Sequence, residues 1–501
     1  MSHQETTSDS SEKVVLHVSY PLLRRHTLVQ MARARELQDD GNEVVLTYCN
    51  ATSGTCAVNF SGSPLACAIC RSRVRETANA NGLTAVPLEI QGPDSVLSPS
   101  EKQEIAEGVH SAVISTFRQL PHDGAETPIN RIIKRRYFQT ACGLLRSMKQ
   151  LLSSESPDRV EVFNGRLACA KFCLTAANRF GIPFNTMEVT GKAKPILFKG
   201  HTAHDRFRIQ ERMRTMPIDM EAAKRYFENR RRPAVNKFTR GYSDDFTPPD
   251  GSGYNRKISV FLSSQDEFEA LGKAWKSPLH NYAAVMHEAC VKNPDYLFCI
   301  RFHPNQADMI SDVRTPFEAI GQLPNVIIYY PTDPANSYTL IEWSDVVLTF
   351  GSTVTVEACW AGKPAIMLGP SFYDQLDVSV NPANMDEFLE VIRQDMEPRP
   401  ARNAAFAAMY MENECDEFRY IGHDGRTMVS NGIPIKRALL SRVARSCDNA
   451  FCRIVKSYSK WYVTRKMASR SAGDKYRQAS DDVSASNSQV SPSELPDAEA
   501  A

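Results

Sequence analysis

The chain has 501 residues, of which 42% are hydrophobic and 23% charged, and its formal net charge is +1. This length and composition are typical of a folded protein of roughly two to three domains with a sizeable core. The balanced charge gives no general attraction for nucleic acid, and no run of apolar residues is long enough to predict a membrane-spanning helix.

The amino terminus and the cysteines indicate the compartment. Residues 1–12 are polar and lack the apolar core of a secretory signal, so we expect a disordered leader. The 13 cysteines are scattered through segments that are predicted to be buried. That distribution suits a reducing compartment better than a disulfide framework, and it predicts a cytoplasmic protein.

The first half opens with a strand at 13–19, a helix at 22–38 and a second strand at 43–48. This order predicts a Rossmann-like domain, which we place at residues 13–247 with a cysteine-rich loop and helical insertions. No Gly-x-Gly-x-x-Gly motif follows the first strand, so a dinucleotide is not indicated.

Four cysteines follow in a turn-rich stretch, with the spacing C-x6-C-x10-C-x2-C; they are Cys49, Cys56, Cys67 and Cys70. Four thiolates on loops can close a structural zinc site or hold an iron–sulfur cluster. The alternative is a set of buried thiols with no ligand, because the first spacing is irregular for a zinc ribbon.

Polar residues follow two later strands of this half. Asn164 and Arg166 come directly after the strand 159–163, where a clamp for an anion or a simple turn at Gly165 are equal alternatives. Glu188 lies near the end of the strand 184–189. With His204 and Asp205, and with the neighbouring His201, it supplies the acid/base candidates of this half by residue type.

A segment rich in proline and glycine at 248–256 is the predicted linker. The second half, at 257–395, alternates strands and helices, which predicts a doubly wound parallel sheet. Ser263 and Ser264 follow its first strand, and Arg301, His303 and Pro304 end or follow the strand at 297–302.

The stretch from 345 to 370 reads DVVLTFGSTVTVEACWAGKPAIMLGP. A buried strand at 345–350 ends at Gly351, Ser352 and Thr353 follow, and helical spacing begins at once, with Glu357 one turn in. A strand, a Gly-Ser-Thr turn and a helix start can hold an anion through free N–H groups and the helix dipole. An ordinary crossover between two strands is the alternative.

Beyond 396 the chain is predicted to be helical. A helix is predicted at 385–394 and another at 401–418, and 431–478 are strongly basic with apolar and aromatic residues at helical spacing. Such a helix either packs on the protein with a solvated basic face or lies on an anionic membrane surface. Residues 479–501 are rich in Ser, Asp, Glu and Pro and are predicted to be disordered.

The His-Pro pair and the Ser-Thr turn after SDVVLTFGS resemble the donor half of GT-B glycosyltransferases, especially bacterial capsule, sialic-acid and Kdo transferases. The resemblance covers residues 258–388 well and the first half loosely. It implies two Rossmann-like domains facing a cleft, with a terminal helix that crosses back from the 396–430 region to the first half. It also implies that the two motifs hold the phosphate of a nucleotide-activated donor.

By the same resemblance, a sugar moves from a CMP-, UDP- or similar donor to a glycan or lipid-linked acceptor of a surface polysaccharide. The acceptor, and with it Asn164 and Arg166, belongs to the first half. No Asp-x-Asp motif lies at a suitable strand end, so transfer without a metal is expected, with Glu357 meeting a donor hydroxyl and Arg301 adding charge. Lipid-linked acceptors would also favour peripheral membrane contact. A nonhydrolysing sugar-nucleotide epimerase, a CDP-glycerol-type glycerophosphotransferase and a noncatalytic scaffold remain alternatives.

Overall fold

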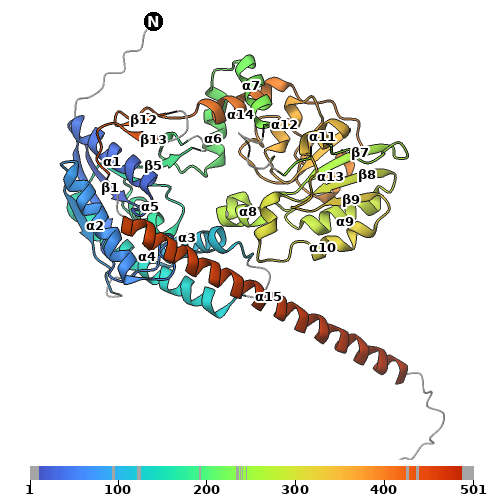
Figure 1. Cartoon of the computed structure of the whole chain (residues 1–501), viewed down its shortest axis with the longest axis horizontal. Coiled ribbons are helices and arrows are strands. Elements are labelled where there is room, and N and C mark those ends of the chain that lie inside the picture. The colour runs from blue at the N-terminus through green and yellow to red at the C-terminus, as the bar shows by residue number, and fades with distance from the viewer. Residues whose placement is uncertain are drawn as a thin grey trace, which may run out of the picture.

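The chain folds into two α/β halves, each built on a mainly parallel sheet, with one long helix running across them (Figure 1). The predicted fold class, with its helical C-terminal region, is confirmed. The computed structural model describes residues 11–92, 96–120, 126–190, 193–232, 236, 239, 241–243, 245–424, 428–435 and 439–487, with the backbone alone from 467 onward.

The first sheet has the order β3-β2-β1-β4-β5-β6, and only the β5–β6 pair is antiparallel. The order in which the strands are added to the sheet changes direction between β1 and β4. The loops after these two strands therefore border a crevice at the carboxyl edge of the sheet. The strands are β1 (Lys13–Val18), β2 (Glu43–Cys49), β3 (Ala85–Leu88), β4 (Arg159–Phe163), β5 (Phe184–Val189) and β6 (Pro195–Lys199).

Five helices pack against this sheet or against one another, and most begin at a side-chain cap. Ser98 caps α3 in a capping box with Glu101, and Ser63 and Thr127 cap α2 and α4, each followed by proline at the first helical position. The helices are α1 (Arg24–Asp39), α2 (Pro64–Ala80), α3 (Pro99–Phe117), α4 (Pro128–Glu155) and α5 (Ala168–Phe180).

The second sheet is fully parallel, in the order β11-β10-β7-β8-β9. Its strands are β7 (Arg256–Phe261), β8 (Tyr296–Arg301), β9 (Val326–Tyr329), β10 (Val346–Thr349) and β11 (Ala365–Met367). The accompanying helices are α8 (Gln265–Leu271), α9 (Tyr282–Lys292), α10 (Thr315–Glu318), α11 (Ser337–Trp343), α12 (Val354–Trp360) and α13 (Met385–Val391). From β7 the chain builds the sheet first outward to β8 and β9 and then on the other side with β10 and β11. The strand order thus changes direction between β7 and β10, which places the ligand crevice of this half beside the Gly351 turn.

Three helices join the two halves: α6 (Arg206–Thr215), α7 (Met220–Arg230) and α14 (Ala401–Asn413). They form one apolar cluster in which Phe198 of the first half and Val356 of the second both take part. The helices α6 and α7 precede the predicted linker in sequence, yet they bury their apolar faces against α12 and α14.

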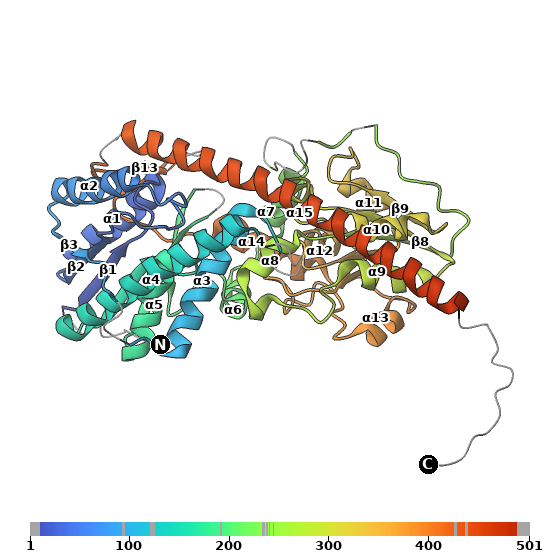
Figure 2. The ribbon, with the colours of Figure 1, turned by 90° about the horizontal axis from the view of Figure 1, so that it is seen from below.

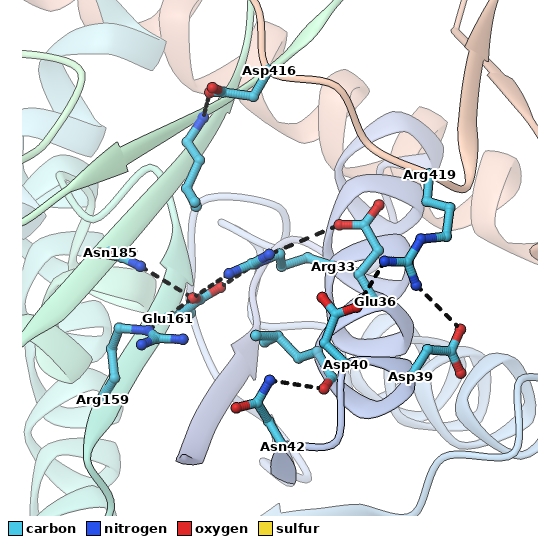
Figure 3. A network of polar contacts seen from close by, with 12 residues as sticks. Arg33, Glu36, Asp39, Asp40, Asn42, Arg159, Glu161, Asn185, Asp416 and Arg419 are labelled. Carbon is cyan, nitrogen blue, oxygen red and sulfur yellow. Dashed lines mark hydrogen bonds and ion pairs between the residues drawn. The ribbon is translucent and has the colours of Figure 1, made fainter. Parts of the chain in front are cut away.

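The chain returns to the first half after α14. Asp416 accepts a hydrogen bond from the Leu197 N–H at 2.6 Å, and the short β12–β13 hairpin (Ile421–His423 and Met428–Ser430) lies beside α1. Arg419 pairs with Asp40 of the loop after α1 at 2.7 Å (Figure 3). The predicted helix of the 396–430 region is α14, which packs between the halves, and the segment after it continues to the first half without helical structure.

The last helix, α15 (Leu439–Asn487), starts on α2 and runs across the molecule toward the second half (Figure 2). It continues beyond residue 478, where composition predicted disorder, while 488–501 and leader residues 1–10 lie outside the described residues. In the described part of the chain, no helix combines the length and apolar character needed to cross a membrane.

Candidate functional site

The second sheet brings three sequence-predicted turns to one edge. The strands β10, β7 and β8 are neighbours and parallel, so their carboxyl ends lie side by side. Gly351 follows β10, Ser263 follows β7 and His303 follows β8. Residues almost ninety positions apart in sequence therefore meet at the edge of the sheet where the strand order changes direction, which is where open α/β sheets bind ligands.

The Gly351 turn is a conformation that glycine alone adopts without strain. Its φ is +88°, and a Cβ atom there would lie 2.5 Å from the Pro370 carbonyl oxygen and 2.9 Å from the Phe268 ring. The Ser352 hydroxyl accepts from the Val354 N–H at 3.3 Å, and the half-buried Thr353 begins α12 without a side-chain cap. Glycine at this position thus lets the backbone pack closely against Pro370 and Phe268.

Glu357 is the residue of this turn whose surroundings differ most from the prediction. Its carboxylate accepts from Arg230 Nε at 2.6 Å and from the Tyr338 hydroxyl at 3.3 Å, and it is only 8% exposed. It was expected to meet a donor hydroxyl. In the structure it holds an arginine of α7 instead.

Arg230 had no signal in the sequence, because it lies in a long arginine-rich segment. Its Nη2 reaches the Thr353 hydroxyl at 3.4 Å while its Nε pairs with Glu357. Burial alone would lower its pKa, but the charge and hydrogen bond of Glu357 raise the pKa above the ordinary value. A permanently charged guanidinium is therefore fixed beside the Ser-Thr turn.

His303, just after β8, and Arg301, the last residue of β8, bond to different partners. His303 Nδ1 accepts from the Asn305 N–H at 3.1 Å, which leaves the proton of the neutral ring on Nε2. Arg301 is 4% exposed, donates from Nε to the Ser337 hydroxyl at 2.9 Å and stacks over the Tyr242 ring. Its charge is thus directed toward α11 rather than toward the Gly351 turn.

The Ser263-Ser264 turn serves a contact between the halves. Ser264 Oγ accepts from Arg118 Nη2 at 2.9 Å and donates to Asp266 at 2.6 Å. Arg118 also makes a two-pronged pair with Asp266, at 2.8 and 3.1 Å. Because Ser263 and Ser264 are both nearly fully buried, this turn fastens α8 to the end of α3.

On the first sheet, Asn164 and Glu188 form a direct pair. Asn164 has a positive φ of 67° and donates from Nδ2 to Glu188 Oε2 at 2.6 Å, while Glu188 Oε1 accepts from the Val189 N–H. Burial raises the pKa of Glu188, and the hydrogen bond from Asn164 opposes that rise only in part. A carboxyl with a raised pKa at a strand end is the kind of group that general-base catalysis uses.

Arg166 connects this edge to the second half. Its Nη1 donates to the Ser111 hydroxyl at 2.6 Å and to the Ser115 hydroxyl at 3.2 Å, and it approaches the Ala270 carbonyl of α8 at 3.4 Å. Burial lowers the pKa of Arg166, and its buried Nε has no hydrogen-bond partner among the described residues. The negative charge of Glu188 opposes this lowering in part, so the two side chains interact electrostatically.

The other acid/base candidates have structural surroundings. Asp205 caps α6 by accepting from the Arg208 N–H at 3.2 Å. Burial, aided by the charge of Arg166, lowers the pKa of His204 to about 3, and its backbone carbonyl accepts from Trp275 Nε1. His201 Nδ1 lies 3.0 Å from the Thr202 carbonyl. Glu188 is therefore the best placed of the predicted bases.

One cavity of about 730 Å³ links the two walls of the site. Glu188 and Thr190 line it from β5, and Arg230 lines it from α7, next to the Ser-Thr turn. The lining continues with aromatic residues from both halves, namely Phe198, Tyr226, Phe372, Tyr373 and Tyr410. A candidate base and a candidate phosphate-binding cation thus line the same cavity.

The four cysteines of the predicted metal site line a separate, largely apolar cavity at the ends of β1 and β2, together with Cys169. The turn-rich prediction is wrong for Cys67 and Cys70, which lie on α2 because Ser63 and Pro64 start a helix there. Burial raises the pKa of Cys49 to about 12. Among the described residues no three His, Cys, Asp or Glu side chains are arranged to hold a metal ion. The zinc site stays a prediction.

Structural comparisons give distant likenesses. A Thermosulfurimonas dismutans KpsC beta Kdo 2,4 transferase is 16% identical, with a TM-score of 0.35, over 51% of this chain and 80% of that one. A Neisseria meningitidis UDP-GlcNAc 2-epimerase bound to UDP-GlcNAc is 12% identical, with a TM-score of 0.29, over 80% of this chain and 97% of that one. At such scores neither likeness decides between the two chemistries.

Sequence comparison is more specific. No curated protein matches the chain. A family model described as "Capsule polysaccharide biosynthesis protein" matches residues 231–412, which contain the His303 turn, the Gly351 turn and Glu357. The resemblance that those two turns predicted is confirmed over this segment, and residues 231–412 are similar to that family.

Proposed function

We propose that this chain is a glycosyltransferase of surface polysaccharide biosynthesis, which moves a sugar from a nucleotide-activated donor to a glycan or lipid-linked acceptor. The observation that carries the proposal is the shared cavity. Its lining includes both Glu188 of the first half and Arg230, which bonds to Glu357 and Thr353 of the second half. The family match over residues 231–412 supports the choice of pathway.

The donor is assigned to the second half. Transfer requires that negative charge on the departing nucleotide phosphate be stabilised as the glycosidic bond breaks. Arg230 is charged at every working pH, and the Ser352 and Thr353 hydroxyls and the N–H groups of the turn are hydrogen-bond donors beside it. His303, with its proton on Nε2, follows β8 at the same edge of the sheet, and β7 lies between β8 and β10. These groups supply the stabilisation from the protein itself.

The base is assigned to Glu188. An acceptor hydroxyl must lose its proton as it attacks the sugar, and a carboxylate with a raised pKa takes that proton more effectively than one with an ordinary pKa. Asn164 holds one oxygen of Glu188 and the Val189 N–H holds the other, so the carboxylate is oriented. The buried His204, with its pKa near 3, is a much weaker base at neutral pH.

Calorimetric titration of CMP, UDP and related nucleotides tests the donor assignment. Ser352→Ala removes a hydroxyl that we expect to donate to a charged phosphate, which contributes roughly 1.5–3 kcal/mol, so affinity should fall by about 10- to 150-fold. The matched control is Ser154→Ala, an exposed hydroxyl on α4 that bonds the Leu151 carbonyl. Equal nucleotide affinity in parent and Ser352→Ala would remove the turn from the donor site.

A panel of nucleotide sugars, with and without glycan acceptors, separates the activities. A transferase releases nucleotide and lengthens the acceptor. An epimerase changes the sugar with no acceptor present, and a glycerophosphotransferase acts on CDP-glycerol instead. A noncatalytic scaffold releases no nucleotide from any member of the panel, and that result, in protein that binds nucleotide, would overturn the proposal.

A further inference from the structure

The helix α15 exposes large apolar side chains to water, although it also buries Ala444, Val455 and Val463 against the protein. The side chains that it buries against the protein include Ser441, Asp448 and Ser459, which bond to Arg73, to the Ser61 N–H and to Thr127. Its exposed side carries large apolar residues instead: Leu439 (73% exposed), Leu440 (59%), Val443 (47%), Ile454 (69%), Tyr458 (38%) and Trp461 (54%). Water does not favour such an arrangement.

These exposed residues form one stripe. At about 100° per residue along a helix, the six apolar side chains and the exposed Cys447 fall within an arc of about 100°. We call this set the α15 stripe. Arg442, Arg453 and Lys460, all exposed, lie along one edge of the stripe, with Arg445 and Lys456 further round toward the buried side. Arg465 lies within the stripe, with its guanidinium over the Trp461 ring.

The helix therefore has three faces instead of the two that the sequence pattern suggests. One face is bound to the protein, one is apolar and uncovered, and a row of cations separates them on one side. An apolar strip flanked by Lys and Arg matches the boundary of an anionic bilayer, where acyl chains take the apolar residues and head groups meet the cations. Tryptophan and tyrosine, which occupy the middle of the stripe, favour that boundary.

We propose that the α15 stripe binds the surface of an anionic lipid membrane and docks the folded protein there. A second copy of the chain suits the stripe less well, because pairing two stripes brings the two rows of arginine and lysine together. A nucleic acid would use the cations and leave the apolar residues uncovered. The proposal does not depend on which sugar or nucleotide the site takes.

Flotation of the full chain with lipid vesicles tests this. The parent should bind vesicles that contain phosphatidylglycerol and bind pure phosphatidylcholine much less. Arg453→Gln with Lys460→Gln should weaken the partition about 25-fold, since each cation near such a surface contributes about fivefold. Ile454→Glu with Trp461→Glu should abolish binding by placing carboxylates where acyl chains should lie.

Matched controls separate docking from general effects. Val291→Glu alters an exposed apolar residue on α9, far from α15 in sequence, and should bind vesicles as the parent does. The exposed thiol of Cys447 provides a second readout, because anionic vesicles should slow its reaction with a maleimide reagent. Cys447→Ser identifies that signal among the thirteen cysteines.

Three results would overturn the proposal. The first is a parent that does not float with anionic vesicles. The second is a glutamate variant of the stripe that floats as well as the parent with an unchanged melting temperature. The third is a parent that dimerises in solution through the stripe and binds no vesicles, which would assign the stripe to a second copy.

Discussion

At the scale of the residue, Glu188 decides the pH dependence of the proposed reaction. Burial raises its pKa above the ordinary value of 4.5, so the base becomes protonated at a higher pH than an exposed glutamate would. The base must be ionised to act. We therefore expect kcat/KM to fall as the pH drops through this raised pKa, with the acid limb above 4.5.

Glu188→Gln should lower kcat by about 10²- to 10⁴-fold and remove that acid limb. The matched comparison is Asp205→Ala, which removes the cap of α6 and should cost about 0.5–2 kcal/mol of stability with little effect on rate. Rate against pH and melting curves of both variants provide the measurement. A glutamine variant that keeps the parental rate and acid limb would transfer the base role to another group.

At the scale of the element, a buried ion network fixes α1 to β4 (Figure 3). Glu161 is fully buried in β4, and both its oxygens accept from Arg33 of α1, at 2.9 and 3.1 Å, with Arg159 and Asn185 at 3.1 Å. Burial alone would raise the pKa of Glu161, but the bonds and charge of Arg33 outweigh it and lower the pKa. The ionised carboxylate therefore stabilises the fold.

Glu161→Gln should lower the free energy of unfolding by about 3–5 kcal/mol at neutral pH, because it removes the buried carboxylate that pairs with Arg33 at 2.9 Å. Since the folded pKa is lowered, the parent has this stabilisation above the unfolded pKa near 4.5 and loses it as the pH falls further. Denaturant unfolding at several pH values should thus show a steeper acid loss in the parent than in the variant. The control is Glu288→Gln, an exposed partner of Lys292, with an effect within about 0.5 kcal/mol.

At the scale of the whole molecule, the two halves are fastened where α3 ends. Arg118 pairs with Asp266 and Ser264 of α8, the Leu120 N–H donates to Ser311, and Ser111 donates to the Ala270 carbonyl at 2.6 Å. Arg206 and Gln210 of α6 bond Asp374 on the far side of the joint. The cavity between Glu188 and Arg230 depends on these contacts for its shape.

The losses of unfolding free energy in Arg118→Met and in Asp266→Leu should add up to more than the loss in the double variant. Each single substitution leaves a buried charge without its partner, whereas the double substitution removes both charges. A double-mutant cycle should give a coupling of about 1–3 kcal/mol between the two residues. Hydrogen exchange should rise in α8 in the Arg118→Met variant and stay unchanged in β2 and α5. If the changes in unfolding free energy were additive and hydrogen exchange in α8 were unchanged, the Arg118–Asp266 pair would not be what holds the two halves together.

The sequence by itself determined the local elements and the chemistry of the turns. Alternating apolar strands and helices predicted both parallel sheets, since each strand is buried on both faces and each helix on one. The sequence also placed the Gly351 turn and the His303 turn directly after strands, while the spatial order of those strands came from the tertiary structure. The Asn164–Glu188 edge was also predicted, although no local pattern indicated that the two side chains bond to each other.

Only the tertiary structure decided which polar groups face which. Ser264 and Arg301 carry suitable chemistry, yet packing between the halves and against α11 turned them to structural partners. Arg230 came to the donor turn because α7 buries its apolar face against α12 and α14, a long-range contact without local signal. The exposed stripe of α15 has the same cause: periodicity fixes which residues share a face, and tertiary packing decides which face is covered.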